Sequence, residues 1–483
     1  MIASGISNKP NKAPLDRPLL IQLVLSVLFS FILIAAAGVF VIAGIYQFYS
    51  QGSAGQNVTQ SFMLAGSLAF AGALVIPSAW YAWKHIAYPH AQRAEKPEPR
   101  RFGLILTLIT LIGSGLALII GNLVAQNDQI AWLILPPLNI IATGLPAIWV
   151  IYFGTRGLLP NIPRYKWGVF ASGLVLGPLI ILIIELAMLI GVGILAIVWI
   201  MLDPTLAPQF SGFLHQLQTM GTNPQAILNN LPTFLLNPGV LFIGFAFVAV
   251  LVPIVEETFK PIGVWFMAGR KITPAQGFGF GVLSGAGFGL FENLGNTSAG
   301  GESWALLAGS RISTLLLHSF TAGLVGWALA YAWSERRFLR LAVCFGIAIL
   351  IHGLWNGMAI LSTASSLEGL VPISLPTWLQ TLATIATPGI FVLGLAVVIG
   401  FFLFNASLRQ NLATAPLPAA ENVNNAYPEA ALPSPETSLP ASTPGGPLTP
   451  PLQAAVDKPS STVHELPLQT SPEIPPKKSE TKP

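Results

Sequence analysis

Residues 19–48 read LLIQLVLSVLFSFILIAAAGVFVIAGIYQF, a stretch that contains no charged side chain. The apolar region of a secretory signal is only about 7–15 residues long, whereas this stretch is long enough to cross a bilayer with some tilt. Lys9, Lys12 and Arg17 precede it. The stretch therefore predicts a first transmembrane helix whose basic N-terminal flank lies in the cytoplasm.

The rest of the chain repeats this pattern. Of the 483 residues, 53% are hydrophobic and 9% are charged, whereas roughly a quarter of the residues in soluble domains are charged. This deficit excludes a soluble domain and a nucleic-acid-binding protein, and it makes the lipid bilayer the main surrounding of the chain. Apolar segments long enough to span occur at 19–47, 61–83, 103–124, 131–153, 168–201, 238–268, 276–296, 303–333, 341–362 and 383–406. The sequence predicts an all-α polytopic membrane protein with about ten transmembrane helices.

Lysine and arginine residues between the predicted spans occur only in alternate loops. They occur in the loops 84–102, 154–167, 269–275 and 334–340. They are absent from the loops 48–60, 125–130, 202–237, 297–302 and 363–382. By the positive-inside rule, the basic loops and both termini are cytoplasmic. We therefore expect a multi-pass protein of the cell (plasma) membrane.

The composition divides the chain into five parts. Residues 413–483 are rich in Pro, Ala, Ser and Thr, which predicts a disordered cytoplasmic tail. The other parts are a cytoplasmic N-terminal segment (1–18), N-terminal transmembrane helices with a long extracytoplasmic loop (19–237), a polar-site core (238–362) and the last transmembrane helix (363–412). Apolar residues such as Phe210 and Phe213 predict an interfacial helix within the long loop.

Eight acidic, basic or histidine residues lie inside predicted spans, where a charge costs about 2.5–3.5 kcal/mol on insertion scales. They are Glu185, Glu256, Glu257, Lys260, Glu292, Arg311, His318 and His352. All except Glu185 lie between residues 256 and 352, on four consecutive spans. At about 1.5 Å per residue, the two histidines, Glu256 and Glu292 lie roughly 16–24 Å from the cytoplasmic helix ends. Four polar groups near mid-membrane indicate one shared polar cavity.

The helical spacing groups these residues further. Lys260 is four residues from Glu256 and three from Glu257, so its ammonium can neutralise one carboxylate and leave the other available. Pro261 has no N–H, which leaves the carbonyl of Glu257 without its helical partner. A broken helix at this depth is tolerated where it lines protein or water. The segment around Lys260 is therefore predicted to line the cavity.

The three following spans each add polar residues in a helical pattern. Glu292 is followed by Asn293, Arg311 and His318 are two turns apart, and His352 is followed one turn later by Asn356. Gly277, Gly281, Gly285 and Gly289 recur at a spacing of four. This glycine stripe predicts the close approach of another helix.

Two glutamates and two histidines at one depth can activate water, bind a metal or relay protons. The sequence contains no His-Glu-x-x-His motif, no aspartate within a span and no Gly-x-Ser-Gly motif. These absences disfavour the membrane zinc metalloproteases, a two-aspartate site and a rhomboid serine site. We expect no required cofactor, because Glu256, Glu292, His318 and His352 include no local pair of zinc ligands. Zinc is not excluded, since these dispersed residues can still assemble one site.

Taken together, the motifs resemble those of the PrsW family. They are Glu256-Glu257-x-x-Lys260, Phe288-x-x-x-Glu292-Asn293, Arg311 through His318 and His352-x-x-Trp355-Asn356. That family looks related to type II CAAX prenyl endopeptidases and bacteriocin-processing membrane proteins. The resemblance covers about residues 240–362 and implies that the core is a glutamic-type intramembrane protease.

The resemblance also implies roles for the residues. Glu256 would be the general base for the attacking water, and His352 with Asn356 would hold the oxyanion. From their spacing and chemistry, we further expect Glu257 and Lys260 to tune and hold Glu256, and Glu292 with His318 to complete the water site, supported by Asn293 and Arg311. The implied substrate is a membrane-anchored protein, similar to an anti-sigma factor or another single-span protein. Two alternatives stay open: a catalytically inert scaffold of the same fold, and a proton- or ion-coupled transporter, for which no internal repeat is visible.

Overall fold

A computed structural model describes residues 17–51, 55–88, 101–220, 233–367 and 376–414. Within these ranges the chain is helical and contains no strand. The elements are α1 (Arg17–Gln51), α2 (Gln56–Ala87), α3 (Phe102–Ala125), α4 (Asp128–Thr155), α5 (Pro163–Ala171), η1 (Ser172–Leu176), α6 (Gly177–Leu202), α7 (Leu206–Met220), η2 (Thr233–Leu236), α9 (Pro238–Ala246), η3 (Phe247–Leu251), α10 (Val252–Phe259), α11 (Ile262–Trp265), α12 (Pro274–Thr297), η4 (Gly301–Ser303), α13 (Trp304–Glu335), α14 (Phe338–Leu367) and α15 (Thr377–Thr414). The predicted all-α fold is confirmed, and the predicted tail from residue 415 onward lies outside the described residues.

Nine helical segments of the described chain are long and apolar enough to cross a membrane. They correspond to nine of the ten predicted spans. Their surfaces carry many large apolar side chains, such as Leu182 and Leu195 on α6, which are 62% and 70% exposed. Contiguous apolar surface of this extent requires lipid or a partner. The chain is therefore a multi-pass membrane protein.

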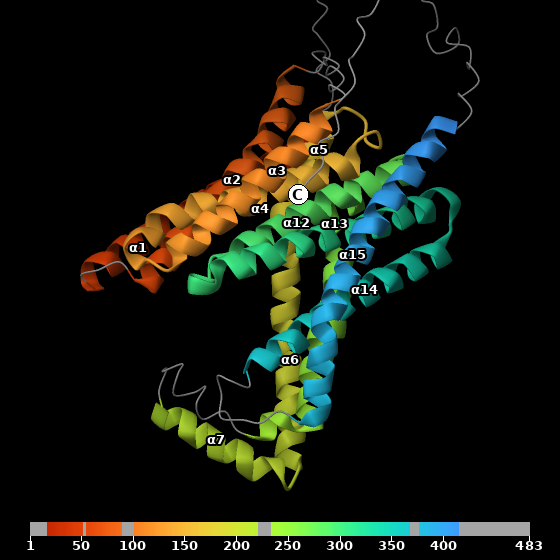
Figure 1. Cartoon of the computed structure of the whole chain (residues 1–483). Coiled ribbons are helices and arrows are strands. Elements are labelled where there is room, and N and C mark those ends of the chain that lie inside the picture. Colours follow the sequence, from red (N-terminus) through yellow and green to blue (C-terminus); the bar gives the residue numbers. More distant parts are fainter. Residues whose placement is uncertain (1–16, 52–54, 89–100, 221–232, 368–375, 415–483) are drawn as a thin grey trace, which may run out of the picture. The chain divides into compact units, whose positions relative to one another are not determined.

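The remaining predicted span, 276–296, corresponds to α12, which forms a helix but is less apolar than the other nine spans. Most of its residues are buried, since α12 packs against α13, α4, α5 and η1. Figure 1 shows α12 between α4 and α13. A helix surrounded by other helices does not need a lipid-soluble surface, so its glycine-rich sequence is compatible with the membrane interior.

The glycine stripe of α12 faces α13, as its spacing predicts. A Cβ atom at Gly281 would meet the carbonyl oxygen of Ala322, and one at Gly285 would meet that of His318. Both obstacles are backbone atoms, which cannot rotate away. The stripe therefore brings the backbones of α12 and α13 together and fixes their register beside the polar residues.

The long loop between α6 and α9 contains the helix that the sequence predicts there. This helix is α7, and Phe210 and Phe213 from it pack against a small cluster of Ile200, Leu206 and Phe234. Its position at the membrane surface stays a prediction.

Candidate functional site

Two carboxylates and one ammonium group meet at the end of α10. Glu256 and Glu257 lie in α10, and Lys260 directly follows its last residue. The Nζ atom of Lys260 is 2.8 Å from Glu256 Oε2 and 2.9 Å from Glu257 Oε1. The side chains of Lys260 and Glu257 are fully buried, and that of Glu256 is 10% exposed. Because the ammonium contacts both carboxylates, the three groups together retain one net negative charge.

The helix break predicted at Pro261 is confirmed, since α10 ends at Phe259 and α11 begins at Ile262. A buried hydroxyl from α12 supports this break. Ser284 Oγ donates to the carbonyl oxygen of Lys260 at 2.5 Å and accepts from the amide of Gly263 at 3.2 Å. One serine thus satisfies two backbone groups that an interrupted helix would otherwise leave unpaired inside the membrane. The break in turn holds Lys260 at the site.

α14 contributes a buried imidazole to this group. His352 Nδ1 lies 3.0 Å from Glu257 Oε1 and 3.2 Å from Lys260 Nζ, and its Nε2 lies 3.7 Å from Glu256 Oε2. At Nδ1, Lys260 can only donate a hydrogen bond, whereas an ionised Glu257 can only accept one. If the shorter contact, with Glu257, is the hydrogen bond, His352 is the tautomer protonated at Nδ1. That tautomer leaves the lone pair of His352 Nε2 on the side of Glu256.

A second polar group lies between α12 and α13. Glu292 Oε1 is 2.6 Å from Arg311 Nη2, and Glu292 Oε2 is 2.7 Å from His318 Nε2. Asn293 fixes the position of Arg311 beside Glu292. Its Oδ1 accepts a hydrogen bond from Arg311 Nε at 2.9 Å, and its Nδ2 donates one to the carbonyl of Arg311 at 2.8 Å. The Nδ1 atom of His318 is buried and has no hydrogen-bond partner among the described residues. Glu292 is 29% exposed and is the most accessible carboxylate of the two groups.

The two groups meet through their histidines. The rings of His318 and His352 are 5.2 Å apart between centroids and nearly perpendicular, at 83°. One potential ligand atom from each of Glu256, His318 and His352 lies within 4.8 Å of the others, and all three residues are buried. Each histidine also has a carboxylate on its other nitrogen, namely Glu257 for His352 and Glu292 for His318.

The potential ligand atoms of Glu256, His318 and His352 are suited to bind a divalent cation. With neutral histidines, the carboxylates of Glu256, Glu257 and Glu292 exceed the cations Lys260 and Arg311 by one negative charge. A buried charge without a partner is costly. One carboxylate and two imidazoles are the ligand set of a class of catalytic zinc sites, which keep a further position open for water. Carboxylates that orient the ligand histidines are the usual second layer around such a metal.

The structure thus brings together eight of the nine residues that the sequence predicts for the site. They are Glu256, Glu257, Lys260 and His352 in the first group and Glu292, Asn293, Arg311 and His318 in the second. Asn356 lies one turn after His352, and its Nδ2 donates to the carbonyl of Val248 at 3.2 Å. Val248 belongs to the π-helical turn η3. The oxyanion role of Asn356 stays a prediction.

The structure also adds residues to the site and shows one intramembrane carboxylate that makes no ion pair with the described residues. Phe288 lies between the two groups, with its ring centroid 5.1 Å from Lys260 Nζ and 5.2 Å from the His318 ring. Ser284, one turn earlier on α12, was missed as a support of the break. Its signal in the sequence is a hydroxyl residue beside the glycine stripe, one turn before Phe288. Glu185 on α6 has no ion-pair partner within 4.0 Å in the described chain.

Comparison with protein families gives one match. Residues 166–385 match the family described as "PrsW family intramembrane metalloprotease". This range contains both polar groups, and it extends beyond residues 240–362, where the recognisable motifs lie. No curated protein and no solved structure matches the chain.

Proposed function

We propose that the protein, which belongs to the PrsW family through residues 166–385, is an endopeptidase that hydrolyses peptide bonds of membrane-anchored proteins within the bilayer. One observation carries this proposal. Glu256, His318 and His352 converge within 4.8 Å at a buried point, although they come from three different helices. Glutamate and histidine are the side chains that most often move protons or hold a metal in hydrolytic sites.

We propose further that Glu256, His318 and His352 hold a divalent cation such as zinc. The lone pair on His352 Nε2 and the unpaired, buried Nδ1 of His318 are the nitrogens available for it. When bound, such a cation would polarise the substrate carbonyl and lower the pKa of a coordinated water.

The remaining residues of the site have roles that follow from their contacts. Glu292 is the only carboxylate of the site with a substantially exposed side chain. It would take a proton from the attacking water and pass it to the leaving amine. Glu257 and Glu292 orient the histidines, and Lys260 and Arg311 balance the carboxylates. Phe288 covers Lys260 and excludes water from it.

A second candidate mechanism needs no metal. It is favoured by the 2.8 Å contact between Lys260 Nζ and Glu256 Oε2, because the ammonium already places a cation beside that carboxylate. In this mechanism Glu256 is the general base, and His352 with Asn356 stabilises the oxyanion. The two mechanisms assign different roles to Glu256, which makes them separable by experiment.

The substrate and location are part of the same proposal. A site at mid-membrane depth, enclosed by helices with apolar outer faces, is accessible to a polypeptide that itself enters the bilayer. We therefore propose a single-span protein, such as an anti-sigma-factor-like protein, as the substrate, and the plasma membrane as the location. The proposal includes no nucleic-acid partner.

The test combines turnover with metal content. The full-length protein is purified in detergent, incubated with a set of single-span peptides, and assayed for cleavage and for bound metal. Under the metal mechanism, Glu256→Gln loses both metal and cleavage, whereas Glu292→Gln keeps the metal and loses roughly 10²–10⁴-fold in rate. Glu302→Gln, at an exposed position, is the matched control and should change neither.

The outcomes separate the proposals. Cleavage by metal-free protein that is lost in Glu256→Gln would establish the second mechanism instead. Wild-type cleavage rates in both Glu256→Gln and Glu292→Gln would remove the proposed hydrolytic site altogether.

A further inference from the structure

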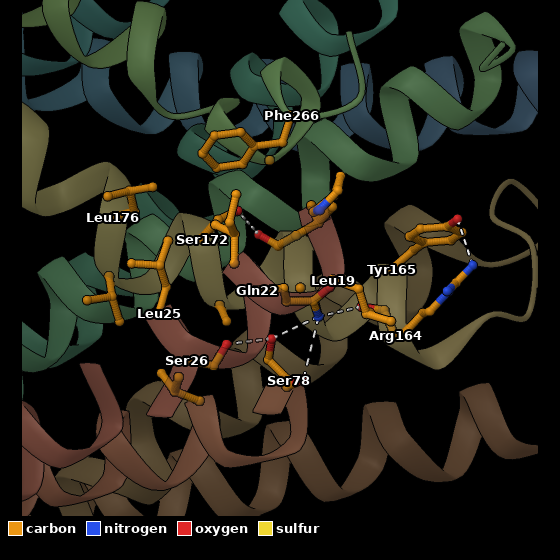
Figure 2. A pocket seen from close by; sticks show the side chains of 18 of the residues that line it. Leu19, Gln22, Leu25, Ser26, Ser78, Arg164, Tyr165, Ser172, Leu176 and Phe266 are labelled. Carbon is orange, nitrogen blue, oxygen red and sulfur yellow. Dashed lines mark hydrogen bonds between the residues drawn. The ribbon is translucent and has the colours of Figure 1, made fainter. Parts of the chain in front are cut away.

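A cavity lies away from the Glu/His site, between the N-terminal helices and the family core. It has a volume of about 390 Å³ and is lined by residues of α1, α2, α5, η1 and the segment 263–270. This volume falls within the range of ligand-binding pockets. None of the residues proposed for hydrolysis lines it. Figure 2 shows the pocket with Leu19, Gln22 and Leu25 of α1 on one side and Phe266 on another.

One end of the pocket carries two guanidinium groups. Arg164 and Arg270 both line it, and both stack on Tyr165, with their Cζ atoms 4.6 Å and 5.1 Å from the ring centroid. Among the described residues, neither arginine has a carboxylate within 4.0 Å. The Nε atom of Arg164 is buried and has no hydrogen-bond acceptor there. Two cations that share one ring and lack a counter-charge form a site for an anion.

Next to the arginines, a row of hydrogen-bonded polar side chains holds together the helices that form the walls of the pocket. Ser26 Oγ donates to Ser78 Oγ at 2.9 Å, and Gln22 Nε2 donates to Ser78 Oγ at 3.1 Å and to the carbonyl of Arg164 at 3.1 Å. Figure 2 shows this row running from Ser26 to Arg164. These bonds join α1, α2 and α5, so the opening between the helices is held by the fold.

The other end of the pocket is apolar. The pocket as a whole follows one face of α1 from Pro18 to Phe29, a length of roughly 16 Å at about 1.5 Å per residue. Leu25, Phe29 and Leu176 form this part of the wall. The pocket therefore has a cationic end, on the side that the loop charges predict to be cytoplasmic, and an apolar part on the side predicted to lie deeper in the membrane.

We propose that this pocket binds one anionic phospholipid of the cytoplasmic leaflet. Its phosphate would contact Arg164 and Arg270, and one acyl chain would lie along Leu25 and Phe29. Two other occupants fit the pocket less well. A free phosphate would leave the apolar part of the pocket empty, and a transmembrane helix of about 10 Å diameter is too wide for a pocket of this size. The bound lipid would join α1 and α2, which precede the family match, to the core. This proposal does not depend on the proposed function.

The test is lipid binding to the full-length protein in detergent, measured by native mass spectrometry. Phosphatidylglycerol and phosphatidylcholine with identical acyl chains are titrated, with glycerol 3-phosphate as a competitor. We expect one retained phosphatidylglycerol, bound more tightly than phosphatidylcholine and not displaced by millimolar glycerol 3-phosphate. The double variant Arg164→Gln/Arg270→Gln should weaken phosphatidylglycerol binding by roughly thirtyfold. Arg164→Lys/Arg270→Lys should retain part of it.

Two matched controls address folding and specificity. Arg156→Gln removes another tyrosine-stacked arginine, whose Cζ is 5.5 Å from the Tyr152 ring, but one that does not line the pocket. Leu25→Trp fills the apolar part of the pocket, whereas Val24→Trp places the same indole on the 54% exposed neighbouring position. We expect loss of the bound lipid in Leu25→Trp and no change in Arg156→Gln or Val24→Trp.

Three results would each overturn the proposal. They are equal binding of the two phospholipids, unchanged binding in both the double glutamine variant and Leu25→Trp, and displacement of the lipid by glycerol 3-phosphate alone. The last result would instead identify a site for a soluble anion. Circular dichroism of each variant confirms that the helices are intact.

Discussion

Replacement of Lys260 by methionine should destabilise the protein strongly. The ammonium is fully buried and contacts two carboxylates at 2.8 Å and 2.9 Å. Methionine fills a similar volume but leaves Glu256 and Glu257 without a cation, so the local charge changes from one negative charge to two. Removing one partner of a buried ion pair typically costs about 3–5 kcal/mol, because a charge stays buried and unpaired. We expect a loss in this range.

The assay is equilibrium unfolding in mixed micelles, monitored by circular dichroism. Lys271→Met is the matched control, since Lys271 lies exposed in the following loop and its replacement should change stability by less than about 0.5 kcal/mol. The double variant Lys260→Met/Glu257→Gln removes a cation and a carboxylate together and should recover most of the loss. A loss in Lys260→Met no larger than that of Lys271→Met, or no recovery in the double variant, would refute the reasoning.

Three further predictions follow from the fold. Gly281→Ala should lower the free energy of unfolding by about 1–3 kcal/mol in the same assay, because the new methyl group meets the backbone of Ala322. Gly295→Ala is the control on the same helix; its methyl group has open space, so the substitution should be neutral or slightly stabilising. Ser284→Ala should lower the free energy of unfolding by about 1–3 kcal/mol, because it removes two hydrogen bonds to backbone groups. The control Ser310→Ala, at an exposed position, should change it by less than about 0.5 kcal/mol. Equal effects of the two substitutions would contradict the role of Ser284 at the helix break. Reporter fusions after positions 60, 128, 220, 300 and 372 should report the exterior, and fusions near 90, 160, 272 and 337 the cytoplasm; a cytoplasmic report at 220 would contradict the predicted topology.

The helices and the residues of the site were predictable because their signals are local. A long apolar run predicts a span wherever it occurs, and Pro261 predicts a break from its missing N–H alone. The glycine stripe also predicted the contact of α12, since a spacing of four places small residues on one helical face. The charges between Glu256 and His352 stood out because ionisable groups are rare within spans.

The parts that the sequence did not predict depend on contacts between distant segments. The sequence predicted a shared cavity for Glu256, Glu292, His318 and His352, but not which three of them offer ligand atoms to one point. That selection depends on the packing of α10, α13 and α14, which no local spacing reveals. The π-helical turn η3 accompanies the contact between Asn356 and the carbonyl of Val248, which are far apart in the sequence. Ser284 acquires its role only because α12 packs beside the broken helix.

Cleavage in water labelled with the heavy oxygen isotope tests the central claim most directly. A single-span peptide is incubated with the protein in lipid vesicles, and its products are analysed by mass spectrometry. We predict a new carboxyl terminus inside the apolar span that carries one labelled oxygen atom, formed by the wild type and not by a Glu256→Gln/His352→Gln double variant. Cleavage confined to the peptide's extramembrane ends, or equal labelled product from the double variant, would contradict water-dependent hydrolysis at the Glu/His site.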